Sequence, residues 1–92
     1  MDIQIRQGPQ CHTSNCFTYR NGDIKYIVIH FTSNNGDTAL NNCNYFSGAN
    51  RGASAHYFVG DDGIYQSVPD KWAAWAVGGT KIYKHPYCRN MN

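Results

Sequence analysis

Four groups of residues in this chain could bind a metal or move a proton. The stretch Cys11-His12-Thr13-Ser14-Asn15-Cys16 holds two thiols and an imidazole, and His85-Pro86-Tyr87-Cys88 holds an imidazole and a thiol. His30 and His56 lie elsewhere, each within an apolar or aromatic stretch. Imidazole and thiolate are the ligand types that zinc prefers in proteins. The chemistry therefore depends on which of these groups the fold brings together.

His30 ends the apolar run Tyr26-Ile27-Val28-Ile29-His30-Phe31-Thr32. A short run of β-branched residues is typical of a strand buried on both faces, so we expect residues 24–32 to form the central strand of a sheet. Side chains at strand ends leave the packed layer and meet solvent. We therefore expect His30 to point into an open polar groove. A lone histidine at a strand end is more often structural than a metal ligand, so its role depends on its neighbours.

The segment after His30 predicts one helix. Asp37 or Thr38 can cap a helix that we place over residues 38–47. Three apolar positions share one face of it at three-residue steps: Leu40, Cys43 and Phe46. Cys43 on that face is expected to be a packed thiol in the core.

A β-hairpin is predicted next, with residues 54–60 pairing with residues 63–68. Asp61-Asp62-Gly63 between them is a strong turn signal. Together these elements predict an α/β fold with a mixed central β-sheet and flanking helices. Its expected core consists of apolar side chains from the strand, the helix and the hairpin: Ile27, Ile29, Leu40, Phe46, Phe58 and Val59.

Composition limits the class of protein. A chain of 92 residues with 14% aromatic and 15% charged residues has room for one core. No run approaches the roughly 18 apolar residues that span a bilayer, and the first residues lack the apolar centre of a signal peptide. We expect synthesis in the cytoplasm, four free thiols, no nucleic-acid partner and no membrane insertion. The net charge of +2 suits an anionic cell wall without identifying it.

Four segments, taken in order, resemble the zinc-dependent N-acetylmuramoyl-L-alanine amidases, which share a fold with phage lysozyme-type amidases and peptidoglycan recognition proteins. They are Ile27-Val28-Ile29-His30-Phe31-Thr32, Ser54-Ala55-His56-Tyr57-Phe58-Val59, Gly63-Ile64-Tyr65-Gln66-Ser67-Val68-Pro69-Asp70 and Ala74-Trp75-Ala76-Val77-Gly78-Gly79. The resemblance implies one amidase domain. Residues 24–92 are its family-like core and residues 1–23 an N-terminal extension.

The resemblance also implies which residues act. Enzymes of this family hold zinc with a histidine at the end of the first core strand, which His30 matches, and with two later ligands. They also use a glutamate on a strand that would follow residues 87–90. The glutamate and the later ligands have no counterpart before Asn92. We therefore expect the chain to be the N-terminal portion of a truncated domain, with no identified catalytic residue. Zinc then belongs to the complete domain and binds this chain weakly or not at all.

Two other clusters could in principle complete a metal site. His30, His85 and Cys88 together would supply the correct ligand types for an amidase zinc. The resemblance instead places residues 85–88 in a loop before the missing strand, and a surface loop is the favoured interpretation. Cys11 and Cys16 have the spacing of some metal knuckles, but no second Cys/His pair lies near them.

His56 and Trp75 are the residues that we expect near the substrate. The resemblance places His56 on a core strand beside the active-site groove, where a hydrogen-bonded histidine is favoured over one in direct contact with substrate. Trp75 is expected to line the same groove as His30. Some relatives carry a catalytic tyrosine before this histidine, whereas here the position is Ala55. That departure favours the bacterial and prophage branch, in which a glutamate moves the proton.

Two functions follow as hypotheses. The first is a peptidoglycan hydrolase, an endolysin that cleaves the bond between N-acetylmuramic acid and L-alanine after release from the cytoplasm. The present chain, as a portion of such an enzyme, is expected to be inactive alone and to self-associate or pair with its missing C-terminal half. The second is a non-catalytic remnant that binds peptidoglycan or serves as an interaction module.

Overall fold

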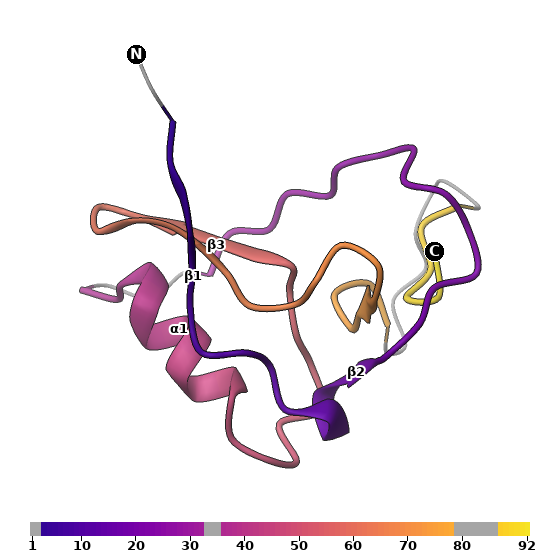
Figure 1. Cartoon of the computed structure of the whole chain (residues 1–92), viewed down its shortest axis with the longest axis horizontal. Helices are drawn as coiled ribbons and strands as arrows, with labels where there is room; N and C mark the ends of the chain where they lie inside the picture. The colour runs from indigo at the N-terminus through magenta and orange to yellow at the C-terminus, as the bar shows by residue number, and fades with distance from the viewer. Residues whose placement is uncertain (1–2, 33–35, 79–86) are drawn as a thin grey trace.

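The computed structural model describes residues 3–32, 36–78 and 87–92 (Figure 1). Its elements, in chain order, are β1 (Ile5–Gln7), the 3₁₀ turn η1 (Thr13–Asn15), β2 (Cys16–Phe17), α1 (Ala39–Phe46), β3 (Tyr57–Gly60), β4 (Gly63–Gln66) and β5 (Ala73–Ala74). Three strands form a mixed sheet in the order β1-β4-β3, and β2 pairs with β5 in a second sheet. The described part is therefore a small mixed α/β fold with one α-helix.

The predicted helix and hairpin are both confirmed, with slightly shorter bounds. Thr38 caps α1, because its side chain accepts the Asn41 N–H, and Ser47 forms the C-cap. β3 and β4 are antiparallel and close at the pair Gly60 and Gly63. Gly63 has a φ of +121°, a conformation that side-chain-bearing residues rarely adopt, which explains the glycine at the end of this turn.

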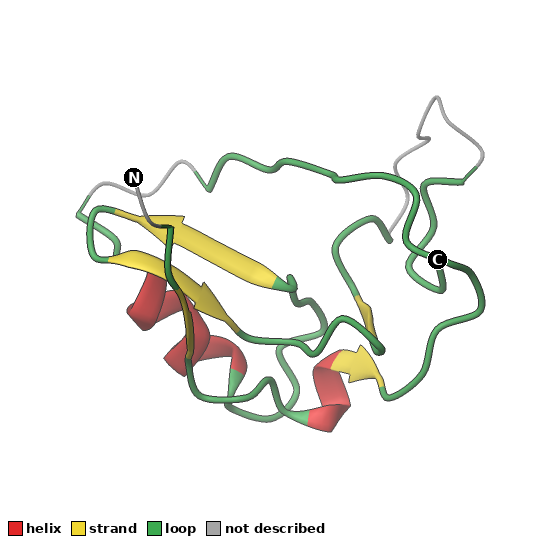
Figure 2. Cartoon of the chain, turned by 45° about the horizontal axis from the view of Figure 1, so that its top comes forward, coloured by secondary structure: helices red, strands yellow, loops and turns green. Residues whose placement is uncertain are grey.

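The hairpin and the helix are joined by an aspartate and by an aromatic stack. Asp62, in the turn between β3 and β4, accepts the N–H groups of Ala39 and Leu40 at 2.8 and 3.0 Å. Phe46 and Phe58 stack with 5.5 Å between their ring centroids. α1 therefore covers one face of the hairpin (Figure 2).

The N-terminal residues are integrated into the fold. β1 pairs in parallel with β4, with Ile5 opposite Ile64. The chain then passes close to α1 at Gly8, where an added Cβ would lie 2.8 Å from the Sγ atom of Cys43. β2 and η1 follow. The boundary that the sequence placed between residues 23 and 24 stays a prediction, but residues 5–17 supply two strands and the 3₁₀ turn.

The prediction of a central strand over residues 24–32 is wrong. None of these residues forms regular secondary structure, and the side chains of Ile27, Ile29 and Phe31 are 89%, 89% and 90% exposed. The segment runs along the side of the hairpin opposite α1 (Figure 2). A strand buried on both faces needs partner strands at its edges and layers on its faces. The described residues give this segment neither, and β1 takes the edge of β4.

The predicted core is wrong in most of its members. Leu40 and Val59 are 37% and 76% exposed, whereas Phe46 and Phe58 are partly buried. Val59 lies on the sheet face away from α1, because it alternates with Phe58. The observed core is made of small side chains: Cys11, Cys16, Ala39, Cys43, Val68, Ala73, Ala74 and Val77. Small side chains can be enclosed within the limited volume of so short a fold.

The cysteines match the prediction of free thiols. Cys43 is fully buried, as expected for a packed thiol on the helix face. Burial raises the pKa of the Cys11 thiol to about 12, and the neighbouring Cys16 contributes to the same shift. A thiol with so high a pKa stays protonated near neutral pH and is a poor nucleophile and a poor metal ligand.

Candidate functional site

A pocket of about 330 Å³ opens beside Trp75. Its walls come from the loop after α1, from the segment after β5 and from the C-terminal residues: Gly52, Ala53, Trp75, Ala76, Gly78 and Asn90. Trp75 packs edge-on against Phe17, with 5.3 Å between ring centroids, so its ring is held against β2. The sequence singled out Trp75 for a substrate groove, and the structure places it in a pocket wall.

Asn15 holds the loop that forms one wall of this pocket. Its side chain is fully buried and donates to the carbonyls of Phe46 and Gly48 at 3.0 and 2.8 Å. Its Oδ1 accepts the N–H groups of Arg51 and Gly52 at 2.7 and 3.1 Å. The amide therefore makes at least four hydrogen bonds, which fix residues 46–52 against η1.

Ser54 connects that wall to Trp75. Its hydroxyl donates to the Asn15 carbonyl at 2.8 Å and accepts the Trp75 N–H at 2.9 Å. The Ser54 N–H in turn donates to the Trp75 carbonyl at 3.2 Å. A buried hydroxyl used both as donor and as acceptor fixes the distance between the two walls. The pocket is therefore set by contacts between segments that are far apart in the sequence.

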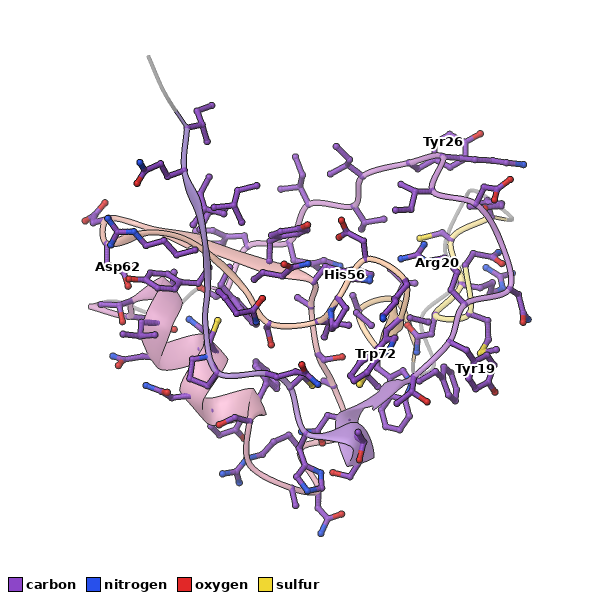
Figure 3. The ribbon with its side chains drawn as sticks, in the orientation of Figure 1. Tyr19, Arg20, Tyr26, His56, Asp62 and Trp72 are labelled. Atoms are coloured by element: carbon purple, nitrogen blue, oxygen red, sulfur yellow. The ribbon has the colours of Figure 1, made fainter. Side chains whose placement is uncertain are left out.

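His56 lies in a polar network with Arg20 and Trp72 (Figure 3). Its Nε2 is 3.1 Å from Nη2 of Arg20 and 2.9 Å from the carbonyl oxygen of Trp72. Nη2 also donates to the Trp72 carbonyl at 3.1 Å, and Nε of Arg20 donates to the Asp70 carbonyl at 2.9 Å. His56 is thus a hydrogen-bonded, partly buried residue, which was the favoured interpretation of its sequence. Its contact with substrate stays a prediction.

Tyr57, next to His56, faces the same turn. Its hydroxyl donates to a carboxylate oxygen of Asp70 at 2.7 Å, and this hydrogen bond, with partial burial, raises the pKa of Tyr57. Gln66 donates to the same hydroxyl at 3.3 Å. These contacts hold the turn after β4 on the end of β3. They support the position of His56 and add no charge to the pocket at Trp75.

Asn15, Arg20 and Asn90 are the residues that sequence reasoning missed. Their long-range partners lie 13 to 72 positions away in the sequence. An asparagine or arginine in a polar stretch gives no local signal of such contacts, because either residue is ordinarily solvated. The strongest hint was indirect: a chain of only 92 residues with little regular secondary structure leaves many backbone groups that need side-chain partners.

His30 lies apart from the pocket and from His56. It is exposed on the irregular segment 24–32 and is not among the residues that line the pocket. In residues 3–32, 36–78 and 87–92, no three His, Cys, Asp or Glu side chains gather in a way that could hold a metal ion. His85 lies outside the described residues, so the combination of His30, His85 and Cys88 stays untested. The described residues do not by themselves fit the zinc site that the resemblance implied.

No helix among the described residues is both long and apolar enough to cross a bilayer.

No solved structure matches the chain. A curated protein of Bacillus licheniformis named "Probable N-acetylmuramoyl-L-alanine amidase" is 43% identical over 56 residues, which are 56% of this chain and 16% of that protein. The chain thus spans about a sixth of the length of this relative. The family model described as N-acetylmuramoyl-L-alanine amidase matches residues 20–92. The chain therefore belongs to the N-acetylmuramoyl-L-alanine amidase family.

Proposed function

We propose that the protein acts in peptidoglycan hydrolysis, as part of an amidase that cleaves the bond between N-acetylmuramic acid and L-alanine. The observation that carries this proposal is the family match over residues 20–92, which includes all four motifs. Within the motifs, the structure supplies a pocket at Trp75 and a fixed His56. Both residues are proposed to contact the wall polymer.

Cleavage is proposed to be a property of the complete domain. His30 matches one family ligand, and the described residues do not fit a full zinc site. One imidazole binds zinc weakly, because tight binding depends on several ligands held together. We therefore propose that zinc, when held by the complete domain, supplies the Lewis acid of the reaction. The 92-residue chain alone is then inactive.

The test compares the 92-residue chain with the product of its full coding sequence on purified cell walls. Cleavage at this bond exposes the α-amino group of L-alanine, which dinitrophenylation and mass spectrometry detect. We expect new N-terminal alanine only with the longer protein, and loss of it in that protein's His30→Ala variant. N-terminal alanine released by the 92-residue chain would contradict the proposal that cleavage needs the longer protein. Full activity of the His30→Ala variant would show that His30 is not a zinc ligand.

A non-catalytic role in binding peptidoglycan is the second candidate. It is favoured by the position of the pocket, whose walls and supporting hydrogen bonds lie within the described residues while His30 lies elsewhere. Sedimentation with insoluble peptidoglycan, with and without a chelator, separates the candidates. Binding that survives chelation supports a recognition module, whereas binding that requires zinc supports a metal-centred site.

The exposed apolar surface supports a further part of the proposal, which is association with another chain. Ile5, Ile64 and Val59 are cross-strand neighbours on the sheet face away from α1. Among the described residues, no strand pairs with the outer edge of β1. An edge that has no partner strand among the described residues, and that carries apolar side chains, can recruit other strands. We propose that the chain self-associates or pairs with the C-terminal half of the domain. A size-exclusion volume that stays monomeric from micromolar to millimolar concentration would contradict self-association.

The proposed setting is that of a bacterial or prophage endolysin. Such a protein is made in the cytoplasm and reaches the cell wall after release. Fractionation of producing cells before and after lysis tests this setting. We expect the protein in the cytoplasmic fraction before lysis and with the walls afterwards, and an exported protein in intact cells would contradict it.

A further inference from the structure

Two buried thiols flank the 3₁₀ turn η1 and lie close together. The Sγ atoms of Cys11 and Cys16 are 3.4 and 3.8 Å from the same oxygen atom, the backbone carbonyl of His12. The two thiols also hydrogen-bond to each other. Both residues belong to one buried cluster, in which they are 2% and 4% exposed. Neither thiol lines the pocket at Trp75.

The backbone on each side of this thiol pair is held by a different element. The Cys11 N–H donates to the Ser67 carbonyl, just after β4, at 2.8 Å. Cys16 is the first residue of β2 and lies opposite Ala74 of β5. The fold therefore brings the two thiols together through contacts that lie far away in the sequence. Sulfur atoms that are already in contact need little movement to reach the length of a disulfide bond.

A metal site does not explain the pair. His12 lies between the two cysteines in the sequence, but its Nδ1 atom accepts the Ser14 N–H at 3.1 Å and is used as the N-cap of η1. In the part of the chain that the structure describes, no third ligand joins the two thiols. Zinc sites in proteins ordinarily have at least three side-chain ligands. Two adjacent thiols without a third ligand are instead suited to forming a bond with each other.

We propose that Cys11 and Cys16 are a redox modification site, at which a small disulfide such as oxidised glutathione converts the two thiols into a reversible disulfide bond. The Cys16 thiolate attacks one sulfur of the oxidant, which forms a mixed disulfide and releases one glutathione thiolate. Cys11 then loses its proton to solvent and attacks the Cys16 sulfur. The bond between Cys11 and Cys16 forms and the second glutathione thiolate leaves. Two protein thiols are thus oxidised, and one disulfide is reduced to two thiols.

The order of attack follows from the surroundings of the two thiols. Burial raises the pKa of both, that of Cys11 to about 12. The hydrogen bond from Cys11 acts in the opposite direction on the pKa of Cys16, because it stabilises the Cys16 thiolate. Cys16 is therefore the thiol that ionises first and attacks the oxidant. Cys11, which is a poor nucleophile toward an external oxidant, attacks only the sulfur that is held beside it.

Opening of β2 controls access to the pair. Both thiols are buried, so a small oxidant reaches Cys16 only when this part of the chain opens. β2 and β5 have two residues each, and so short a pairing opens at a low cost in free energy. The bond would close residues 11–16 into a ring that contains Asn15, whose side chain holds the loop at Gly52. Oxidation is therefore expected to strengthen the support of that loop.

The first experiment incubates the 92-residue chain with oxidised glutathione, alkylates the remaining thiols in denaturant and measures the intact mass. We expect two alkylated thiols, those of Cys43 and Cys88, in place of the four of the reduced chain. Trypsin should release residues 7–20 as one peptide, lighter by two hydrogen atoms than its reduced form, because Arg6 and Arg20 flank both cysteines. Four alkylated thiols after prolonged incubation, or a disulfide that involves Cys43 or Cys88, would overturn the proposal.

The second experiment tests which thiol attacks first. Cys11→Ala leaves the attacking thiol without its partner, so a stable glutathione adduct should accumulate at Cys16. Cys16→Ala should form little adduct at Cys11. Cys88→Ala removes a thiol outside the pair and is the control, which should form the same disulfide at the rate of the unaltered chain. Equal adducts in the Cys11→Ala and Cys16→Ala variants, with dispersed NMR spectra in both, would contradict Cys16 as the attacking thiol.

The third measurement asks whether the folded chain accommodates the bond. The oxidised chain should unfold at a higher denaturant concentration than the reduced chain, because the bond restricts the unfolded state. Dithiothreitol should restore the four thiols and the original midpoint. A lower midpoint after oxidation would show that the bond distorts η1, and it would overturn the pair as a site built into the fold. None of these measurements uses peptidoglycan, so their outcome is independent of the proposed function.

Discussion

Two neighbouring stretches of the N-terminal third differ sharply in how they are packed. Residues 5–20 are mostly polar, yet they supply two strands, the fully buried Asn15 and the Arg20 contacts to His56. Residues 24–32 are far more apolar, yet Ile27 and Ile29 are 89% exposed. The difference teaches that hydrophobicity alone does not bury a segment. A segment is buried when other backbone and side-chain groups are available to pair with it.

The two stretches also differ in their relation to the pocket. Asn15 reaches one wall through Gly52 and the other through Ser54 and Trp75. His30, on the apolar stretch, lines no part of it. The N-terminal residues outside the match at 20–92 therefore organise the pocket that we propose for substrate, whereas the motif around His30, our proposed zinc ligand, does not.

The largest expected effect is at Asn15. We expect Asn15→Ala to lower the free energy of unfolding by roughly 3 kcal/mol, because it leaves buried carbonyl and N–H groups unpaired. Chemical denaturation followed by tryptophan fluorescence measures this. The pocket signals of Trp75 should shift as well, since the loop at Gly52 loses its support. A loss below about 0.5 kcal/mol, which is usual for an exposed position, would mean that residues 5–20 are not packed as described.

A smaller effect is expected at Gly8, where the N-terminal stretch crosses α1. The added Cβ of Gly8→Ala would lie 2.8 Å from Sγ of Cys43 and 3.4 Å from the Gln66 carbonyl oxygen. We expect a loss of about 1–3 kcal/mol from this overpacking, measured by the same denaturation. The double variant Gly8→Ala with Cys43→Ala should recover part of the loss, because the clashing thiol is gone. An absence of recovery would place the strain elsewhere.

A pH-dependent effect is expected at Asp62. Hydrogen bonds from the backbone of Leu40 and Ala39 lower the pKa of this carboxyl. Because the pKa is lower in the folded state, the stabilisation is present above the unfolded-state pKa and is lost as pH falls through the folded-state value. Helix content followed by circular dichroism should therefore decline at acidic pH, and Asp62→Asn should flatten that decline. The neighbouring change Asp61→Asn is the control. An equal flattening of the decline in Asp61→Asn would show that the pH dependence does not come from the hydrogen bonds of Asp62 to the start of α1.

The smallest effect is expected at Ile29. Its side chain is 89% exposed, so Ile29→Ala should change the free energy of unfolding by less than about 0.5 kcal/mol. This variant is the direct counterpart of Asn15→Ala and uses the same measurement. A loss of about 2–5 kcal/mol, as for a buried isoleucine, would show that residues 24–32 are packed in solution. The contrast between the two stretches would then disappear.

Local signals in the sequence identified α1 and the hairpin. Thr38 could be recognised as a cap, and Asp61-Asp62-Gly63 as a turn, because each depends on backbone geometry within a few residues. The ordered motifs identified the family, and they drew attention to Trp75 and His56. Local patterns could not identify Asn15, Arg20 or Asn90, because each acts through partners far away in the chain.

The sequence by itself thus determined the helix, the hairpin, the family and the residue types available to a site. Only the tertiary structure decided that β1 takes the edge of β4, that small residues form the core and that Asn90 is oriented at the pocket. The physical reason is that periodicity reports which faces are apolar, while strand pairing and side-chain hydrogen bonds depend on which partners meet. For residues 24–32, the apolar pattern was present and the described residues supplied no partner strand.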